Sequence, residues 1–138
     1  MLSYRPIQYI LEKYLKKVMR LKERYYLIKR LADLIEEMNK DLDFVIVEGK
    51  KDKKVLSILG FKKKIILVNS KILPNGKFTI LTDFDREGKR FEKILIKKYG
   101  EKNFVKIYRK KFYELLEEYK IKEIGDLENS IKKVSNLF

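Results

Sequence analysis

The amino-acid sequence predicts an α/β fold in which helices flank a mainly parallel, four-stranded sheet and a long amphipathic helical segment comes first. Two observations lead to this prediction. After residue 40, short apolar runs alternate with helical patterns, as in parallel sheets with crossover helices. Before residue 40, apolar residues recur in a spacing of four and three, and glycine is absent. We therefore divide the chain into a helical amino-terminal extension, residues 1–40, and an α/β domain with carboxyl-terminal helices, residues 41–138.

The extension carries two apolar rows at helical spacing. A single helix of roughly 35 residues would be about 50 Å long, more than the diameter of the rest of the domain, so part of it must project, bend or meet a partner. The shorter row predicts that the second half packs on the sheet, and the first half becomes the candidate for a homodimer contact. A helix hairpin with a break near residues 22–24 is the alternative. The long row is Ile7, Leu11, Tyr14, Val18, Leu21, Tyr25, Ile28, Ala32 and Ile35, and the short row is Leu27, Leu31, Leu34 and Met38.

Four strands are expected in the domain, at residues 43–48, 65–68, 78–81 and 104–108. Helices are expected after residue 49, with Asp52 as cap and Gly60 as end, and at 86–99, ending at Gly100 with Phe91, Ile94 and Leu95 inward. Two further helices are expected at about 110–120 and 126–137, with Asp126 as a cap.

The connection at residues 69–77 leaves the topology open. Nine residues are fewer than the dozen or more that a parallel crossover usually takes. Pro74-Asn75-Gly76 could form a turn that makes the flanking strands antiparallel neighbours. A mainly parallel sheet is preferred, because both acidic motifs described below must meet at one sheet edge.

Composition restricts the partners and the chemistry. The net charge of +14, from 34 Lys and Arg against 20 Asp and Glu, favours a polyanionic partner, nucleic acid before membrane. Heat-adapted proteins are also rich in charge, which explains the number of charged residues but not the excess of one sign. The absence of Cys and His excludes disulfides, thiol nucleophiles, imidazole bases and the usual zinc sites. No apolar run is long enough to span a membrane and no secretory signal pattern is present, so we expect a cytoplasmic protein.

Carboxylates follow two of the predicted strands. Glu48 ends the first, while Asp83 and Asp85 stand two residues apart where the third gives way to a helix, followed by Glu87. Side chains two apart leave the same face of an extended chain, and hard oxygen ligands suit Mg²⁺. Glu87 is either a third ligand or a favourable charge at a helix amino terminus.

These motifs resemble the Toprim domain of type IA topoisomerases, bacterial-type primases and small ribosomal RNA maturases. The matching segments are residues 45–49, Val-Ile-Val-Glu-Gly, and residues 81–88, Leu-Thr-Asp-Phe-Asp-Arg-Glu-Gly. The resemblance implies a Toprim-like fold, a general acid or base at Glu48 and Mg²⁺, or Mn²⁺, at Asp83 and Asp85. It makes Glu48, Asp83 and Asp85 the catalytic candidates and adds Glu48 and Glu87 to the candidate metal ligands. Lys89 departs from the topoisomerase version, in which a further acid usually follows the glycine.

Basic residues beside the acids are interpreted as phosphate contacts, because an acidic pocket alone would repel a polyanion. We predict a small Toprim nuclease acting in RNA processing on structured RNA, with RNA favoured over DNA and a helper protein possible. The alternative is a non-catalytic nucleic-acid-binding or assembly subunit. The Lys62-Lys63-Lys64 run is interpreted as a solvated face. The predicted nucleic-acid contacts are Lys50, Lys51, Arg86, Lys89, Arg90, Arg109 and Lys110.

Overall fold

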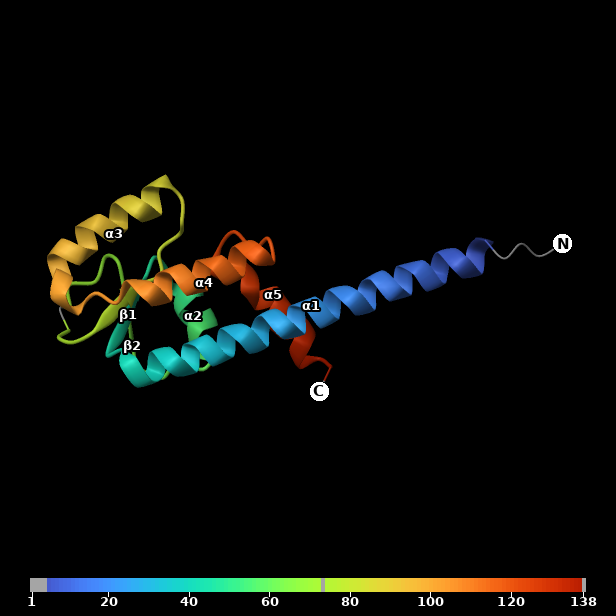
Figure 1. Cartoon of the computed structure of the whole chain (residues 1–138), viewed down its shortest axis with the longest axis horizontal. Coiled ribbons are helices and arrows are strands. Elements are labelled where there is room, and N and C mark those ends of the chain that lie inside the picture. Colours follow the sequence, from blue (N-terminus) through green and yellow to red (C-terminus); the bar gives the residue numbers. More distant parts are fainter. Residues whose placement is uncertain (1–4, 73, 138) are drawn as a thin grey trace.

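The computed structural model describes residues 5–72 and 74–137 and has an α/β architecture that is mostly helical (Figure 1). Residues 1–4, part of the segment in which no secretory signal is expected, lie outside the described residues. Two 3₁₀ turns, η1 (Glu101–Asn103) and η2 (Ile124–Asp126), separate the later helices. The main elements are α1 (Arg5–Asp41), β1 (Phe44–Val47), α2 (Lys50–Ile58), β2 (Lys64–Leu67), β3 (Phe78–Ile80), α3 (Arg86–Tyr99), α4 (Lys106–Glu118) and α5 (Leu127–Ser135).

The sheet is parallel, with β1 in the centre and the strand order β2-β1-β3. Ile46 of β1 pairs with Ile66 of β2 and Ile80 of β3. The prediction of a parallel sheet is confirmed, and the antiparallel alternative is wrong because β2 and β3 are not neighbours. The connection can be short because the strands have only three or four residues, so an extended loop of about ten residues, reaching roughly 33 Å, returns to the other end of the sheet.

The predicted strand at residues 104–108 is wrong. Phe104 forms one isolated parallel bridge with Phe78, and helix α4 begins at Lys106, so the described residues contain a three-stranded sheet. The physical reason lies further along the chain. Tyr108, Phe112 and Leu116 are buried at a spacing of four, which is the period of a helix face, whereas Ile107 is exposed.

The sheet has a core on each face. Val45 and Val47 point into the larger core, which α1, α2, α4 and α5 complete, while Phe44 and Ile46 point into a smaller core closed by Leu95 of α3. Because successive strand residues face opposite sides, the continuous apolar run of β1 supplies both cores.

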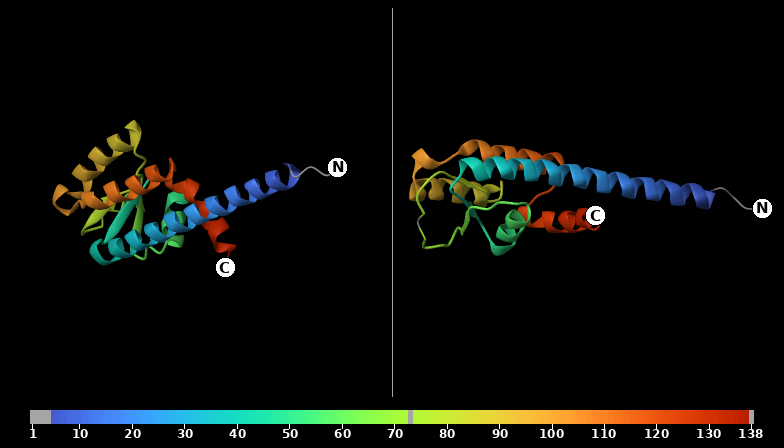
Figure 2. Two further views of the ribbon diagram at one scale, coloured as in Figure 1. Left: turned by 45° about the vertical axis from the view of Figure 1, so that its right-hand side comes forward. Right: turned by 90° about the horizontal axis from the view of Figure 1, so that it is seen from below.

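Helix α1 is one continuous helix of 37 residues, so the hairpin alternative is wrong. Its carboxyl-terminal part packs on the domain through Leu27, Leu31, Ile35 and Met38, which are buried in the larger core with residues of α4 and α5. Residues 7–20 are all exposed, and the amino-terminal half extends well beyond the body of the molecule (Figures 1 and 2). The prediction that the second half packs on the domain is confirmed.

The predicted helix ends are largely confirmed. Helix α3 ends at Gly100, which has a φ of 101° that favours glycine. Ile94 is 52% exposed, so its predicted inward position is wrong, whereas Leu95 is buried. Asp52 stabilises the start of α2 from within its first turn, where its Oδ2 accepts the Gly49 N–H at 3.3 Å.

Asp126 precedes α5 at the expected capping position, but its side chain makes no capping hydrogen bond there. Across residues 5–72 and 74–137, no helix combines the length and the apolar character needed to cross a membrane.

Candidate functional site

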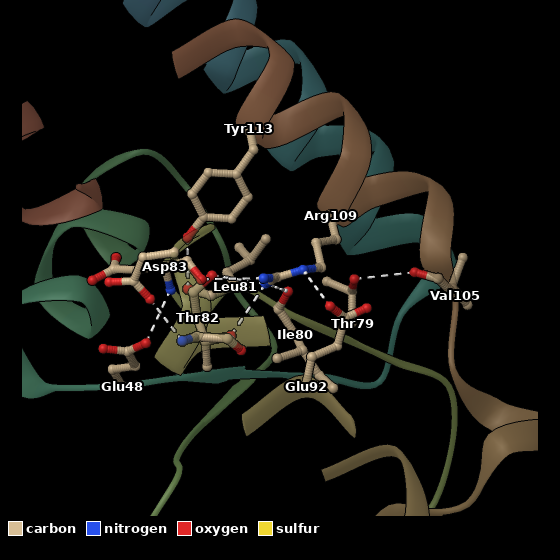
Figure 3. Close-up of polar contacts among 12 residues, drawn as sticks. Glu48, Thr79, Ile80, Leu81, Thr82, Asp83, Glu92, Val105, Arg109 and Tyr113 are labelled. Atoms are coloured by element: carbon tan, nitrogen blue, oxygen red, sulfur yellow. Dashed lines mark hydrogen bonds and ion pairs between the residues drawn. The ribbon is translucent and has the colours of Figure 1, made fainter. Parts of the chain in front are cut away.

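Two predicted site residues meet at the carboxyl edge of the sheet. Glu48 directly follows β1, and Asp83 lies three residues after the end of the neighbouring strand β3. The Oε1 atom of Glu48 accepts the backbone N–H of Asp83 at 3.0 Å (Figure 3). The parallel pairing of β1 and β3 therefore joins the two motifs, which lie 35 residues apart in the sequence.

The loop from Thr82 to Gly88 holds the other two acids. Asp85 is the N-cap of α3, where its Oδ1 accepts the Gly88 N–H at 2.7 Å. The buried Thr82 hydroxyl donates to the Gly88 carbonyl at 2.9 Å. A Cβ atom on Gly88 would overlap the carbonyl oxygen of Asp83, so only glycine permits this close approach. Asp85 and Glu87 stand exposed at the amino terminus of α3, where negative charge is favourable.

The electrostatics of the site follow from burial and crowded negative charge. Burial, followed by the charge of Glu48, raises the pKa of Asp83 to about 7. Burial also raises the pKa of Glu48, with Asp85, Asp52 and Glu87 adding to the increase, although the hydrogen bond from the Asp83 N–H opposes it. The site is therefore a cluster of acids, which we call the acidic pocket for short, in which a proton or a cation is favoured.

Two further acids belong to this environment. Burial raises the pKa of Asp52, and Glu123 raises the pKa of both Asp52 and Asp83. Glu123 comes from the segment that leads into η2, which packs beside α2. The sequence analysis assigned Asp52 to capping only and missed Glu123. A lone glutamate in a polar loop carries no signal in the sequence, because only the packing of η2 on α2 brings it near the strand ends.

Arg109 of α4 holds the end of β3 from inside the protein. Its Nη1 donates to the carbonyls of Ile80 and Thr82 at 2.9 and 2.7 Å, and its Nη2 donates to the carbonyl of Asp83 at 3.3 Å (Figure 3). Its Nε lies 3.1 Å from Oε2 of Glu92, an ionic contact in which the N–H is not directed at the oxygen. The guanidinium thus fixes the backbone from which Asp83 projects.

This position overturns the prediction that Arg109 contacts phosphate. The residue is only 2% exposed, and its guanidinium lies 5.2 Å from the ring centroids of both Phe84 and Tyr113. A side chain buried in this way is not accessible to a polyanion. Tyr113 completes the support, since its hydroxyl donates to the carbonyl of Leu81 at 3.1 Å and burial raises its pKa.

The other predicted phosphate contacts remain available at the surface. Five of them lie near the starts of α2 and α3. The sixth, Lys110, is exposed on α4, where its Nζ lies 3.8 Å from the Glu114 carboxylate. Lys89 also lies over the ring of Phe84 at 4.7 Å. Their role as phosphate contacts stays a prediction. The exposed set comprises Lys50, Lys51, Arg86, Lys89, Arg90 and Lys110.

The donor chemistry of the pocket fits a hard divalent cation. Within the described residues, no group of three acids is arranged to hold a metal ion. Mg²⁺ commonly takes only one or two carboxylates, with water and substrate phosphate as its remaining ligands. Asp83 supplies one such carboxylate, and Glu48, which accepts the Asp83 N–H, lies beside it. Burial and the neighbouring acids raise the pKa of Asp83, so a cation beside it would relieve the repulsion. Asp85 and Glu87 flank the pair from the start of α3.

Comparison with known proteins identifies the family. No family model matches the chain. A UPF0292 protein of Archaeoglobus fulgidus is 31% identical over 113 residues, which cover 76% of this chain and 90% of that protein. The chain belongs to the UPF0292 family. A second UPF0292 protein, from Thermococcus onnurineus, is 32% identical over 77 residues, covering 50% of this chain and 58% of that protein.

The fold also has a counterpart among solved structures. A protein from Aquifex aeolicus superposes with a TM-score of 0.52 at 23% sequence identity, covering 74% of this chain and 95% of that one. At this level of identity the similarity extends to the fold alone.

Proposed function

We propose that this protein carries out Mg²⁺-dependent phosphodiester chemistry on nucleic acid, as a small nuclease of the Toprim type acting on structured RNA. The observation that supports the proposal most strongly is that Glu48 and Asp83 meet at the ends of adjacent parallel strands. The Glu48 carboxylate accepts a hydrogen bond from the Asp83 backbone N–H. The carboxyl edge is where parallel sheets usually bind ligands. Mn²⁺ would suit the same donors.

The acids of the site would have different roles. Asp83 would hold the cation, with Asp85 and Glu87 beside it at the start of α3, and Glu48 would mainly transfer protons. When bound, Mg²⁺ would neutralise charge on the phosphoryl oxygens. Glu48 accepts one backbone N–H and keeps its second carboxyl oxygen for proton transfer, and its raised pKa brings it closer to neutral pH. Arg109 and Tyr113 would keep the Asp83 backbone in place without touching substrate.

The exposed basic residues beside the pocket would contact the phosphate backbone. Lys50 and Lys51 begin α2, and Arg86, Lys89 and Arg90 lie in the first turns of α3, so both sets flank the acids. Phosphate contacts of this kind orient a nucleic acid without reading its sequence. A helper protein that presents the RNA remains part of the proposal.

One observation favours a second candidate, a non-catalytic nucleic-acid-binding or assembly subunit. No three acids of residues 5–72 and 74–137 are arranged to hold a metal ion, and one oxygen of Asp85 already caps α3. A module that only binds nucleic acid needs no metal. The two candidates therefore differ in whether Mg²⁺ or Mn²⁺ binds.

The test combines calorimetric titration of Mg²⁺ and Mn²⁺ with cleavage of structured RNA, duplex DNA and single strands, with chelator as the blank. Asp83→Asn should abolish metal binding and cleavage and, because it removes repulsion from Glu48, raise the melting temperature of the metal-free protein. Glu48→Gln should retain much of the metal binding but reduce cleavage by about 10²–10⁴-fold, because glutamine cannot transfer a proton.

Two variants serve as controls. Asp85→Asn removes charge but keeps a good N-cap residue, so any loss of metal binding reflects charge rather than unfolding of α3. Asp33→Asn, at an exposed position of α1, removes the same charge far along the chain and should change nothing. Cleavage by Glu48→Gln at the normal rate would disprove its proposed catalytic role. Absence of metal binding by the unmodified protein would favour the non-catalytic subunit.

A further inference from the structure

A basic groove lies between the projecting half of α1 and the carboxyl end of α5, away from the acidic pocket. Its volume is about 860 Å³, and its remaining lining residues are Leu21, Asn136 and Leu137. Figure 2 shows α5 running beside α1 where α1 leaves the body. The groove is lined by six basic residues and no acidic one, namely Lys13, Lys16, Lys17, Arg20, Arg24 and Lys133.

Among the described residues, no cation of the groove forms an ion pair. Within residues 5–72 and 74–137, eight ion pairs form, and none of them includes a basic residue of the groove. Lys13 lies 4.4 Å from the centroid of the Tyr9 ring. Two helices distant in the sequence thus bring positive charges together, and an anion in the groove would relieve their repulsion.

The cations also occupy an unusual face of the helix. Four of them continue, at the same spacing, the row by which α1 packs on the body, so the face of α1 that is apolar and buried in the second half becomes cationic in the first. We call this row the inner row. The apolar row Ile7, Leu11, Tyr14 and Val18 of the projecting half lies on another face of the helix. The inner row is Lys13, Lys17, Arg20, Arg24, Leu27, Leu31, Leu34 and Met38.

We propose that the basic groove binds the phosphate backbone of a nucleic acid. Lys13 and Arg24 are eleven residues apart in the helix, or about 16 Å at 1.5 Å per residue. One strand of a duplex carries roughly one phosphate per 3.4 Å, so this length of helix spans about five phosphates of one strand and offers them four cations of the row. The proposal rests on the proposed function in one respect, that the partner is nucleic acid, and it adds a second contact surface.

Other anionic partners fit the groove less well. An acidic protein segment would need apolar anchors, and Leu21 and Leu137 are the two apolar side chains in the lining. A bilayer that took up the exposed apolar side chains of α1 would leave the groove on its far side. A nucleic-acid backbone needs only the charge.

The basic groove adjoins a second cavity. This neighbouring cavity of about 360 Å³ shares Arg20, Arg24 and Lys133 with the groove, and the acids Glu23 and Asp126 also line it. The purely basic lining therefore ends at the groove, which confines the proposed phosphate contacts to the groove itself.

The test measures binding of a fluorescently labelled RNA hairpin by anisotropy, in chelator, over a series of KCl concentrations. The groove variant combines Lys17→Gln, Arg20→Gln and Arg24→Gln in the full chain. The control combines Lys62→Gln, Lys63→Gln and Lys64→Gln, which removes the same charge from another exposed run. The groove variant should bind about 10- to 100-fold more weakly at moderate salt and lower the salt slope by about 2 to 3, since about one counterion is released per phosphate contact. The control should bind nearly as tightly as the unmodified protein.

A second variant, Lys16→Gln with Lys133→Gln, tests both walls of the groove and should weaken binding in the same direction. Equal weakening by the groove variant and the control would overturn the proposal, as would unchanged binding in a groove variant with the normal helical spectrum. Loss of binding to anionic phospholipid vesicles with RNA binding retained would also overturn it.

The test separates the groove from the metal chemistry. Groove-dependent RNA binding in a protein that neither binds Mg²⁺ nor cleaves would leave the groove standing and remove the nuclease. If the groove variant instead cleaves RNA with Mg²⁺ at the normal rate, with RNA below saturation, the nuclease proposal stands and the groove proposal fails.

Discussion

The two halves of helix α1 have similar residue spacing but different surroundings. From Leu27 onward the inner row is apolar and buried against α4 and α5. From Lys13 to Arg24 the same row is cationic, and an apolar row that includes Ile7, Leu11 and Val18 is exposed on another face. A periodic pattern thus shows that both halves are helical, but it does not show which face meets the rest of the protein. Substitutions in the body should therefore change the free energy of unfolding. Substitutions in the projecting half should change binding to RNA or to a second copy of the chain.

The largest effect is expected inside the body, at Arg109. Arg109→Met should lower the free energy of unfolding by about 3–5 kcal/mol, because it leaves Glu92 and three carbonyl groups without their buried partner. Urea denaturation measures the change. Lys102→Met, which removes an exposed cation, should alter stability by less than about 0.5 kcal/mol. Arg109→Lys should recover only part of the loss, because one ammonium group cannot reproduce the planar contacts.

A matched pair of substitutions tests the comparison directly on one helix. Leu31 is fully buried, so Leu31→Ala should cost about 2–5 kcal/mol of unfolding free energy. Leu11 is 55% exposed, so Leu11→Ala should change it by less than about 0.5 kcal/mol. Chemical denaturation of both variants is sufficient. Equal losses would mean that the projecting half is packed against something in solution, a second copy included.

The smallest effect concerns self-association through the exposed apolar side chains of α1. We expect a weak homodimer that strengthens with salt, because Lys17, Lys22 and Arg24 flank the apolar row and repel their counterparts until screened. Light scattering over a concentration series measures it. Leu11→Glu combined with Val18→Glu should leave a monomer. Since RNA binding in the groove should weaken with salt, the two faces of one helix should respond oppositely. A monomer at every salt concentration would exclude this contact.

Much of the site could be predicted from particular residues. The apolar runs that end in Glu48 and in Asp83 predicted both strands, and Gly100 predicted the end of α3. The meeting of Glu48 with Asp83 followed from the expectation of a parallel sheet, and the hydrogen bond between them agrees with it. Their catalytic and metal-binding roles stay predictions.

The predictions for other residues were wrong or missing because their surroundings are formed by residues that are distant in the sequence. Arg109 is the first of three consecutive basic residues, a pattern typical of an exposed surface. It is nevertheless buried, because α4 packs across the end of β3. The segment at 104–108 is a short apolar run interrupted by one lysine, which is typical of a strand, but the next apolar residues continue at a helical spacing and their burial favours a helix. Glu123 reaches the pocket only because η2 packs beside α2.

The sequence by itself determined what depends on neighbours along the chain: the first three strands, most of the helices, the turn glycines, the acids at strand ends and the excess positive charge. Only the tertiary structure decided which face of α1 is covered, that Arg109 lies inside, and that α5 meets α1 to form a basic groove. The physical reason is that burial and electrostatic environment are properties of packed surfaces. Residues far apart in the chain create them, and local periodicity records only which side chains share a face.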